Sequence, residues 1–230
     1  DFKIDNKESC FYQNYLKNIC FQEGIKLLTS PSSIKMPSQI SATIAFKRGL
    51  EAVNKEYFLF WEHDHIFTKK LDWDLIKDCF NNGGKMLRFN RKKNKIVNEY
   101  FIQKGLIENF EMIKESDFNK NILKSNFYSN GPFISEKKYC KDLWNRVDFI
   151  YPLWNGNFGG FIEGPVNHKM LFDQFNMGNI NFDKIYPIFL YGGKDFNPIV
   201  AHKGDYEPSY TVNLFSAKFI IQLLKNSLKS

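Results

Sequence analysis

Residues 57–65 read Tyr-Phe-Leu-Phe-Trp-Glu-His-Asp-His, five apolar side chains followed directly by four ionisable ones. A continuous apolar run bounded in this way predicts a β-strand that is covered on both faces. Charged groups beside a buried strand are costly unless they are paired or bound to a metal. If strand geometry continues past Trp61, Glu62 and Asp64 share one face and the two histidines share the other.

This charged tetrad, residues 62–65, has three interpretations. Two carboxylates on one face suit a hard divalent cation such as Mg²⁺ or Mn²⁺. His63 and His65 make zinc a competing ion, so a metal-dependent hydrolase that uses them with Asp64 is an alternative. The plainest interpretation is a solvated loop after the strand.

The segments around the strand predict an alternation of strands and helices. The predicted elements are, in order, a strand at 2–4, a helix at 9–20, a strand at 25–28, a helix beginning near Ser38 and a strand at 57–61. This alternation indicates an α/β fold with a parallel sheet. Ligands of such sheets bind beyond the carboxyl ends of the strands, and both Asp5 and the tetrad fall at such ends.

The second half of the chain is less regular. We predict helices at 72–80, 135–147, 165–175 and 212–228, and strands at 85–89, 96–101 and 185–191. No repeat or linker divides the sequence, so we expect one domain over residues 1–230. Because Asp1 precedes a predicted strand so closely, we also expect further residues of the same sheet upstream of it. The last helix carries Phe and Leu beside Lys, so membrane contact is an alternative to packing on the domain.

The composition limits the classes of partner. The chain has 230 residues and a formal net charge of +7. A basic balance favours nucleic acid, an anionic membrane surface or a phosphorylated small substrate. The basic cluster at residues 91–95 is typical of a solvated loop, so we expect no nucleic-acid partner. The four cysteines, at positions 10, 20, 79 and 140, form no Cys-x-x-Cys pair, which indicates reduced thiols in a cytoplasmic protein.

Two adjoining stretches resemble a known family. Residues 41–52 read Ser-Ala-Thr-Ile-Ala-Phe-Lys-Arg-Gly-Leu-Glu-Ala, and residues 56–64 read Glu-Tyr-Phe-Leu-Phe-Trp-Glu-His-Asp. Together they are similar to the GT-A glycosyltransferases, especially family 2, in which such a helix leads into an apolar strand that closes with a DxD motif. The resemblance implies the nucleotide-diphospho-sugar transferase fold, a Rossmann-like α/β arrangement of a mixed, mostly parallel sheet flanked by helices.

The resemblance implies five residues that bind the nucleotide sugar. Asp64 corresponds to the last acidic residue of the motif, which is the family's metal ligand. Glu62 stands where the family has the first Asp, so the motif here has the form ExD. Asp5 takes the position of the acidic residue that binds the base, and Lys47 and Arg48 are candidates for contact with the donor phosphates.

The later part of the chain carries the implied catalytic and second metal residues. Glu163, just before a predicted helix, resembles the family's general base for inverting transfer. His202 resembles a C-terminal histidine that completes metal coordination with Asp64. On this basis residues 1–101 form the nucleotide-sugar half, and residues 102–230 form the acceptor-side half with the C-terminal helix.

The expected activity is a metal-dependent sugar transfer. The donor is a nucleotide sugar, with UDP-sugar as first expectation, the cofactor is Mn²⁺ or Mg²⁺, and the acceptor is a hydroxyl of a glycan or glycoconjugate. A nucleotidyltransferase of the same sheet type and a basic nucleic-acid- or protein-binding domain without catalysis are the alternatives. We expect a cytoplasmic protein, with peripheral membrane contact left open.

Overall fold

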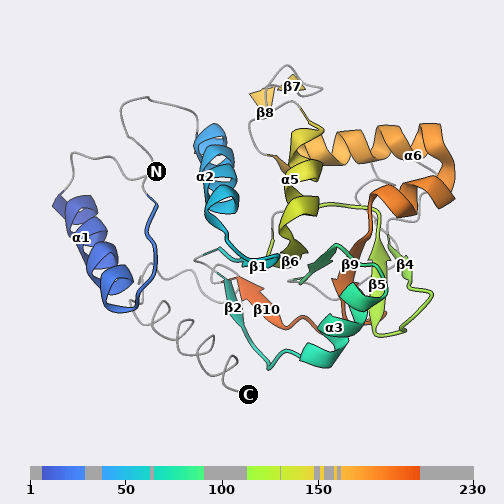
Figure 1. Ribbon diagram of the computed structural model, residues 1–230, viewed down its shortest axis with the longest axis horizontal. Coiled ribbons are helices and arrows are strands. Elements are labelled where there is room, and N and C mark those ends of the chain that lie inside the picture. The colour runs from blue at the N-terminus through green and yellow to red at the C-terminus, as the bar shows by residue number, and fades with distance from the viewer. Residues whose placement is uncertain are drawn as a thin grey trace.

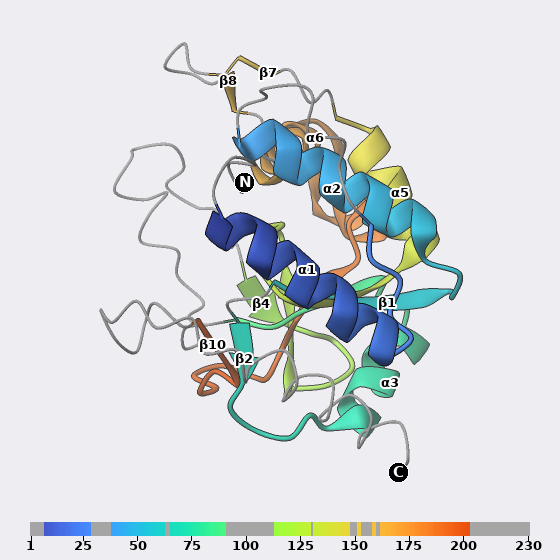
Figure 2. The same cartoon turned by 90° about the vertical axis from the view of Figure 1, so that its left-hand side faces the viewer.

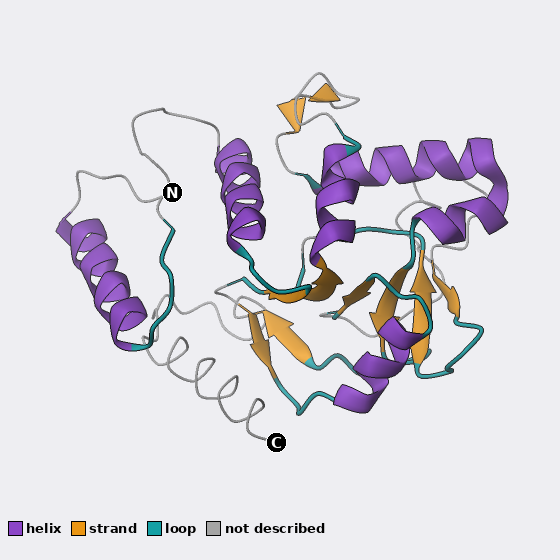
Figure 3. Ribbon diagram, in the orientation of Figure 1, coloured by secondary structure: helices purple, strands orange, loops and turns teal. Residues whose placement is uncertain are grey.

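The computed structural model describes residues 7–28, 38–62, 65–90, 113–129, 131–147, 151–152, 158–159 and 162–202. Five helices in these ranges are α1 (Lys7–Gln22), α2 (Ser38–Ala52), α3 (Trp73–Asn81), α5 (Lys137–Asn145) and α6 (Glu163–Ile185). The strands are β1 (Tyr57–Phe60), β2 (His65–Phe67), β3 (Met86–Arg88), β4 (Ile113–Glu115), β5 (Ile122–Ser125), β6 (Phe133–Glu136), β7 (Tyr151–Pro152), β8 (Phe158–Gly159), β9 (Ile188–Tyr191) and β10 (Val200–His202). The protein is therefore α/β, as predicted, with a mixed sheet flanked by helices (Figures 1 and 3).

The main sheet has six strands in the order β1-β6-β3-β9-β5-β4. β3 and β9 are parallel, and the other four neighbouring pairs in this described sheet are antiparallel. The predicted mostly parallel sheet is therefore wrong in its pairing. The reason is that β6 and β5 run against the remaining strands and lie between them, so that strands of one direction rarely become neighbours.

The predicted helix at residues 135–147 is confirmed as α5 apart from its first two residues, which belong to β6. Phe133 packs in the core on one face of the sheet and Ile134 in the core on the other, so this segment is covered on both faces as a strand. The helix α5 begins only at Lys137, whose backbone N–H donates to the Glu56 carbonyl at 2.7 Å. Burial on both faces therefore outweighed the helical spacing of the first residues.

Two apolar cores hold the layers together. The first core lies between the sheet and α2, α5 and α6, and it contains Leu50, Trp144, Val166 and Met170. The second core lies between the sheet and α3 with β10, and it contains Ile76, Leu87, Phe189 and Val200. Both views show α2, α5 and α6 on one side of the sheet and α3 on the other (Figures 1 and 2).

β1 contributes to both cores, as the sequence of residues 57–61 predicted. Phe58 and Phe60 pack against the first core, while Leu59 and Trp61 pack against the second. The Phe60 ring stacks on Phe133 of β6 with centroids 5.0 Å apart. Burying an aromatic side chain of this size contributes about 1.5–3 kcal/mol, so the alternation fixes the strand's register.

The predicted strand at residues 25–28 is wrong. Helix α1 ends at Gln22, and Gly24 just beyond it has a positive φ of 65°. The Ile25 N–H donates to the Cys20 carbonyl at 2.7 Å. The four residues that follow have no regular structure, and their side chains are exposed. An apolar sequence becomes a strand only where a neighbouring strand and a core accept it.

The remaining predictions of elements were mostly confirmed where the structure describes them. The helices at 9–20, 38 onward, 72–80 and 165–175 correspond to α1, α2, α3 and the first half of α6, and the strands at 85–89 and 185–191 to β3 and β9. The strands at 2–4 and 96–101 and the helix at 212–228 lie outside the described residues. No described helix combines the length and apolar character needed to cross a membrane.

Candidate functional site

The C-terminal ends of β1 and β3 lie at the same end of the sheet. Phe60 is the register partner of Phe133, and Phe133 is also the partner of Arg88. Adjacent strands are about 4.8 Å apart, so the last residues of β1 and β3 are separated by about 10 Å. β1 and β3 both run antiparallel to β6. The segments that follow them, beginning at Trp61 and Phe89, therefore leave the sheet at the same end, which is called the edge of the site below.

The charged tetrad begins at this edge, and two of its residues are described. The His65 N–H donates to the Glu62 carbonyl at 3.2 Å, and the His65 Nδ1 lies 3.5 Å from Glu62 Oε2. The Trp61 indole N–H also donates to the His65 carbonyl, at 3.1 Å. The extension of strand alternation through the tetrad is therefore wrong, because β1 ends at Phe60 and the backbone hydrogen bond replaces strand geometry.

His65 is buried and Glu62 is half-buried. The described half of the tetrad is thus not a solvated loop, and burial of two ionisable groups needs the contact that they make with each other. Asp64, the principal predicted ligand, lies outside the described residues, as does His63. Their part in the site stays a prediction.

A short two-stranded ribbon brings His202 to the tetrad. β10 pairs antiparallel with β2, and His202 is the register partner of His65, although 137 residues separate them in sequence. Opposite residues of an antiparallel pair have Cα atoms about 4.5–5.5 Å apart and lie on one face of the ribbon. The ribbon is anchored in the second core by Val200, and the Thr68 N–H donates to the Ile199 carbonyl at 2.7 Å.

Glu163 is the first residue of α6 and is half-buried. The preceding Ile162 is fully buried in the first core, which fixes where the helix begins. No side chain at the N-cap position accepts a hydrogen bond from the helix. An acidic residue in the first turn interacts favourably with the positive end of the helix dipole.

Arg88, at the end of β3, is the site residue that the sequence analysis missed. Its side chain is buried, and its Nη1 donates to Ser125 Oγ at 3.1 Å and to the Phe127 carbonyl at 2.6 Å. Burial lowers the pKa of Arg88 to about 10, while the nearby negative charge of Glu163 acts in the opposite direction. A charged residue inside the apolar run Met-Leu-Arg-Phe was the signal that could have revealed it.

Lys47 and Arg48 lie on α2, which packs on the first core. Phe46 next to them meets Phe60 edge to face, with centroids 4.6 Å apart. Burial lowers the pKa of Lys47, and Glu51 on the following turn raises it. Arg48 is exposed. Their contact with donor phosphates therefore stays a prediction.

The ion-binding predictions rest on residues that are only in part described. Within the described ranges, no three His, Cys, Asp or Glu side chains converge as metal ligands. The backbone of His202 is described, whereas Asp5 and Asp64 lie outside the described residues. Burial raises the pKa of the Cys79 thiol to about 12, and it also raises the pKa of Cys140, as expected of inert, reduced cysteines.

Comparison with known proteins gave no match. No family model matches the chain, and neither a curated protein nor a solved structure shows significant similarity to it.

Proposed function

We propose that the protein is a metal-dependent glycosyltransferase of the GT-A type, which moves a sugar from a UDP-sugar to an acceptor hydroxyl with inversion. The observation that carries the proposal is the pairing of β2 with β10. It places His202 opposite His65, the residue next to Asp64 in the chain. His202 is thereby brought opposite the residue that directly follows Asp64 in the chain, and the sequence suggested one metal for Asp64 and His202.

The donor atoms of the proposed ligands suit the ion. Asp64 and His202 would hold Mn²⁺ or Mg²⁺, with the carboxylate of Glu62 close by, because it already contacts His65. Carboxylate oxygens are preferred by Mg²⁺ and Mn²⁺, and imidazole is a common further ligand for transition metals. The bound ion would supply neutralisation of the charge that develops on the leaving diphosphate.

Glu163 is the proposed general base. Its carboxylate takes the proton of the acceptor hydroxyl as the acceptor oxygen forms a bond to the anomeric carbon of the sugar. The bond from that carbon to the diphosphate oxygen breaks, and its electron pair leaves with the nucleoside diphosphate. Attack opposite the leaving group inverts the anomeric centre. Glu163 is half-buried at the start of α6.

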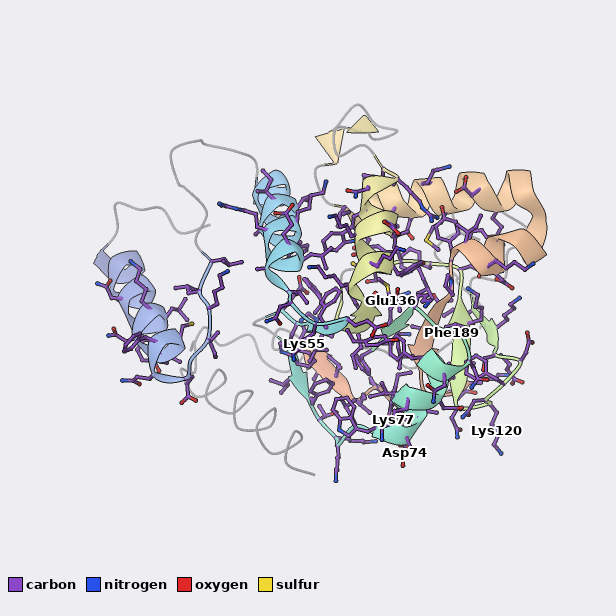
Figure 4. All side chains as sticks on the ribbon, in the orientation of Figure 1. Lys55, Asp74, Lys77, Lys120, Glu136 and Phe189 are labelled. Atoms are coloured by element: carbon purple, nitrogen blue, oxygen red, sulfur yellow. The ribbon has the colours of Figure 1, made fainter. Side chains whose placement is uncertain are left out.

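Calorimetric titration of UDP, GDP, ADP and CDP in Mn²⁺ and in EDTA tests the proposal. We expect binding that requires the metal and is tightest for UDP. Asp64→Ala should abolish the metal-dependent part. The matched control is Asp74→Ala, because Asp74 lies exposed on α3 and pairs with Lys77 at 3.3 Å (Figure 4). Equal affinity in Mn²⁺ and EDTA would remove the metal from the proposal.

A second pair of variants tests the ribbon. His202→Ala should weaken metal-dependent UDP binding by about tenfold or more, since loss of a metal ligand or its support has effects of this size. His168→Ala, within α6, is the control and should leave it unchanged. Equal losses in the two variants would show that His202 has no special part in holding the ion.

A further inference from the structure

Arg88 occupies a position that is unfavourable for a charged side chain. It is a charged residue on an inner strand of the sheet, between β6 and β9, with only 8% of its surface exposed. Burying a charge is costly unless hydrogen bonds and an opposite charge offset the loss of water. Ser125 and the Phe127 carbonyl satisfy Nη1, and the guanidinium lies over the Phe127 ring at 5.3 Å. These contacts orient Arg88, but they supply no negative charge.

Hydrogen bonds link Arg88 to the helix of Glu163 through Phe127, Tyr128 and Asn167. The negative charge of Glu163 opposes the effect of burial on the pKa of Arg88. Glu163 begins α6, and the N-terminus of a helix is its positive end. A cation near that end is repelled by the positive end of the helix dipole. Helix stability therefore does not account for Arg88, whereas a requirement for a fixed positive charge near the Glu163 carboxylate does.

A pair of hydrogen bonds, called the clamp here, joins the segment that binds Arg88 to α6. The Tyr128 N–H donates to Asn167 Oδ1 at 2.8 Å, and Asn167 Nδ2 donates to the Tyr128 carbonyl at 2.9 Å. Asn167 follows Glu163 by four residues, so both lie on one face of α6. The clamped residue directly follows Phe127, which binds Arg88. The segment from Ser125 to Tyr128 thus joins the end of β3 to the face of α6 that carries Glu163.

We propose that Arg88 is a positioning residue for Glu163, holding the carboxylate by electrostatic attraction at the place where it accepts the acceptor's proton. This inference rests on the proposed function and adds a residue to it. Arginine suits the task because its planar guanidinium can keep hydrogen bonds to the protein through one nitrogen while its charge acts elsewhere. Small displacements of a reacting group can lower a rate by as much as about a hundredfold, so such positioning is worth its cost.

The test compares Arg88→Gln with Arg88→Lys and with a control, Lys124→Met. Lys124 is also a buried cation bonded to a carbonyl, that of Tyr186, but it lies at the other end of α6. The assay is Mn²⁺-dependent turnover of UDP-glucose and UDP-N-acetylglucosamine with water as acceptor. UDP affinity by calorimetry and the melting temperature are measured on the same samples.

For Arg88→Gln we expect kcat to fall by about tenfold or more, with the donor KM and the UDP affinity within about twofold of wild type. Arg88→Lys should recover part of kcat because it restores the charge. Lys124→Met should leave kcat within about twofold at a temperature where the protein is folded, whatever its effect on melting. A purely structural role for Arg88 predicts instead that kcat of folded Arg88→Gln equals that of wild type, and this result would overturn the inference.

If Arg88→Gln does not fold, Ser125→Ala replaces it. This variant removes one of the two bonds that orient Nη1 and keeps the charge. It should lower kcat without changing the donor KM, and unchanged kcat would equally overturn the inference. Failure of the proposed function has a different signature, because wild type then shows neither metal-dependent UDP binding nor turnover, and the positioning role falls with it.

Discussion

Arg88 and Lys124 are two buried cations at opposite ends of α6, and they are held in different ways. Burial lowers the pKa of both, to about 10 for Arg88 and about 8 for Lys124. Lys124 donates to the carbonyl of Tyr186, the residue that caps α6, and lies 3.7 Å from Asp183. The C-terminus of a helix is its negative end, so a cation there is favourable.

Arg88 is linked through Phe127, Tyr128 and Asn167 to the N-terminal turns of the same helix, whose first turn carries the acidic Glu163. The difference teaches that a buried charge alone does not mark a functional residue. Lys124 completes a helix terminus and needs no further explanation. The charge of Glu163 opposes the effect of burial on Arg88, and helix stability gives no reason for the cation, so these two residues are the pair to test.

The largest expected effect comes from Glu163→Gln. The amide keeps the size of the carboxylate but cannot accept the proton, so kcat should fall by about 10² or more while the donor affinity stays nearly unchanged. Steady-state kinetics with a UDP-sugar and calorimetry with UDP measure the two quantities. Glu115→Gln, an exposed change on β4, is the control. Unaltered turnover in Glu163→Gln would reduce Glu163 to a helix-dipole partner and erase the contrast with Lys124.

The buried Lys124 should make the free energy of unfolding depend on pH. Its pKa is about 8 when folded, against 10.5 for an ordinary lysine, so between these values the unfolded chain binds more protons. The Lys124 contribution to the free energy of unfolding therefore rises from pH 8 to 10.5, by about 3 kcal/mol in all. Below pH 8 it is constant.

Urea unfolding of wild type and Lys124→Met at pH 7 and pH 10.5 measures this contribution as a difference between the two proteins, which cancels the titration of other groups. Between pH 7 and pH 10.5 the free energy of unfolding of wild type should increase by about 3 kcal/mol relative to that of Lys124→Met. Lys120→Met is the matched control, because Lys120 is an exposed lysine two residues before the start of β5 (Figure 4). A constant difference between pH 7 and 10.5 would mean that Lys124 is solvated in solution.

Asn167→Ala should break the clamp at the Arg88 end. It leaves the N–H and carbonyl of Tyr128 without their described partner in a buried place, which costs about 2 kcal/mol of unfolding free energy. Chemical denaturation measures it, with Asn145→Ala, exposed at the end of α5, as the reference. Because the clamp joins Glu163's face to the segment that binds Arg88, kcat should fall as well. A loss of stability without a loss of kcat would separate the clamp from the site.

The smallest expected effect calibrates the two helix starts. Asp72 is the N-cap of α3, and its Oδ1 accepts from the backbone N–H groups of Asp74 and Leu75 at 3.0 and 3.1 Å. Asp72→Ala should cost about 1 kcal/mol of stability. The exposed Asp74→Ala should cost less. Glu163→Gln removes no cap bond, so a loss of stability larger than that of Asp72→Ala would measure the part of Glu163 in offsetting the buried charge of Arg88.

Local patterns determined the elements that lie within one stretch of sequence. The five apolar residues at 57–61 predicted β1 with both faces covered, and the local sequence at 72–80 and 165–175 predicted α3 and the first half of α6. Ser38 correctly marked the beginning of α2. These predictions succeeded because hydrogen bonding in a helix and burial of alternate side chains in a strand depend on near neighbours.

Only the tertiary structure decided which segments meet. β6 is a strand because two cores cover it. Residues 25–28 form no strand, because their side chains stay exposed. The pairing of His202 with His65 and the hydrogen bonds between Tyr128 and Asn167 join residues far apart in the chain. Such contacts follow from strand order and from the shapes of packed cores, and these are properties of the whole molecule that no local spacing encodes.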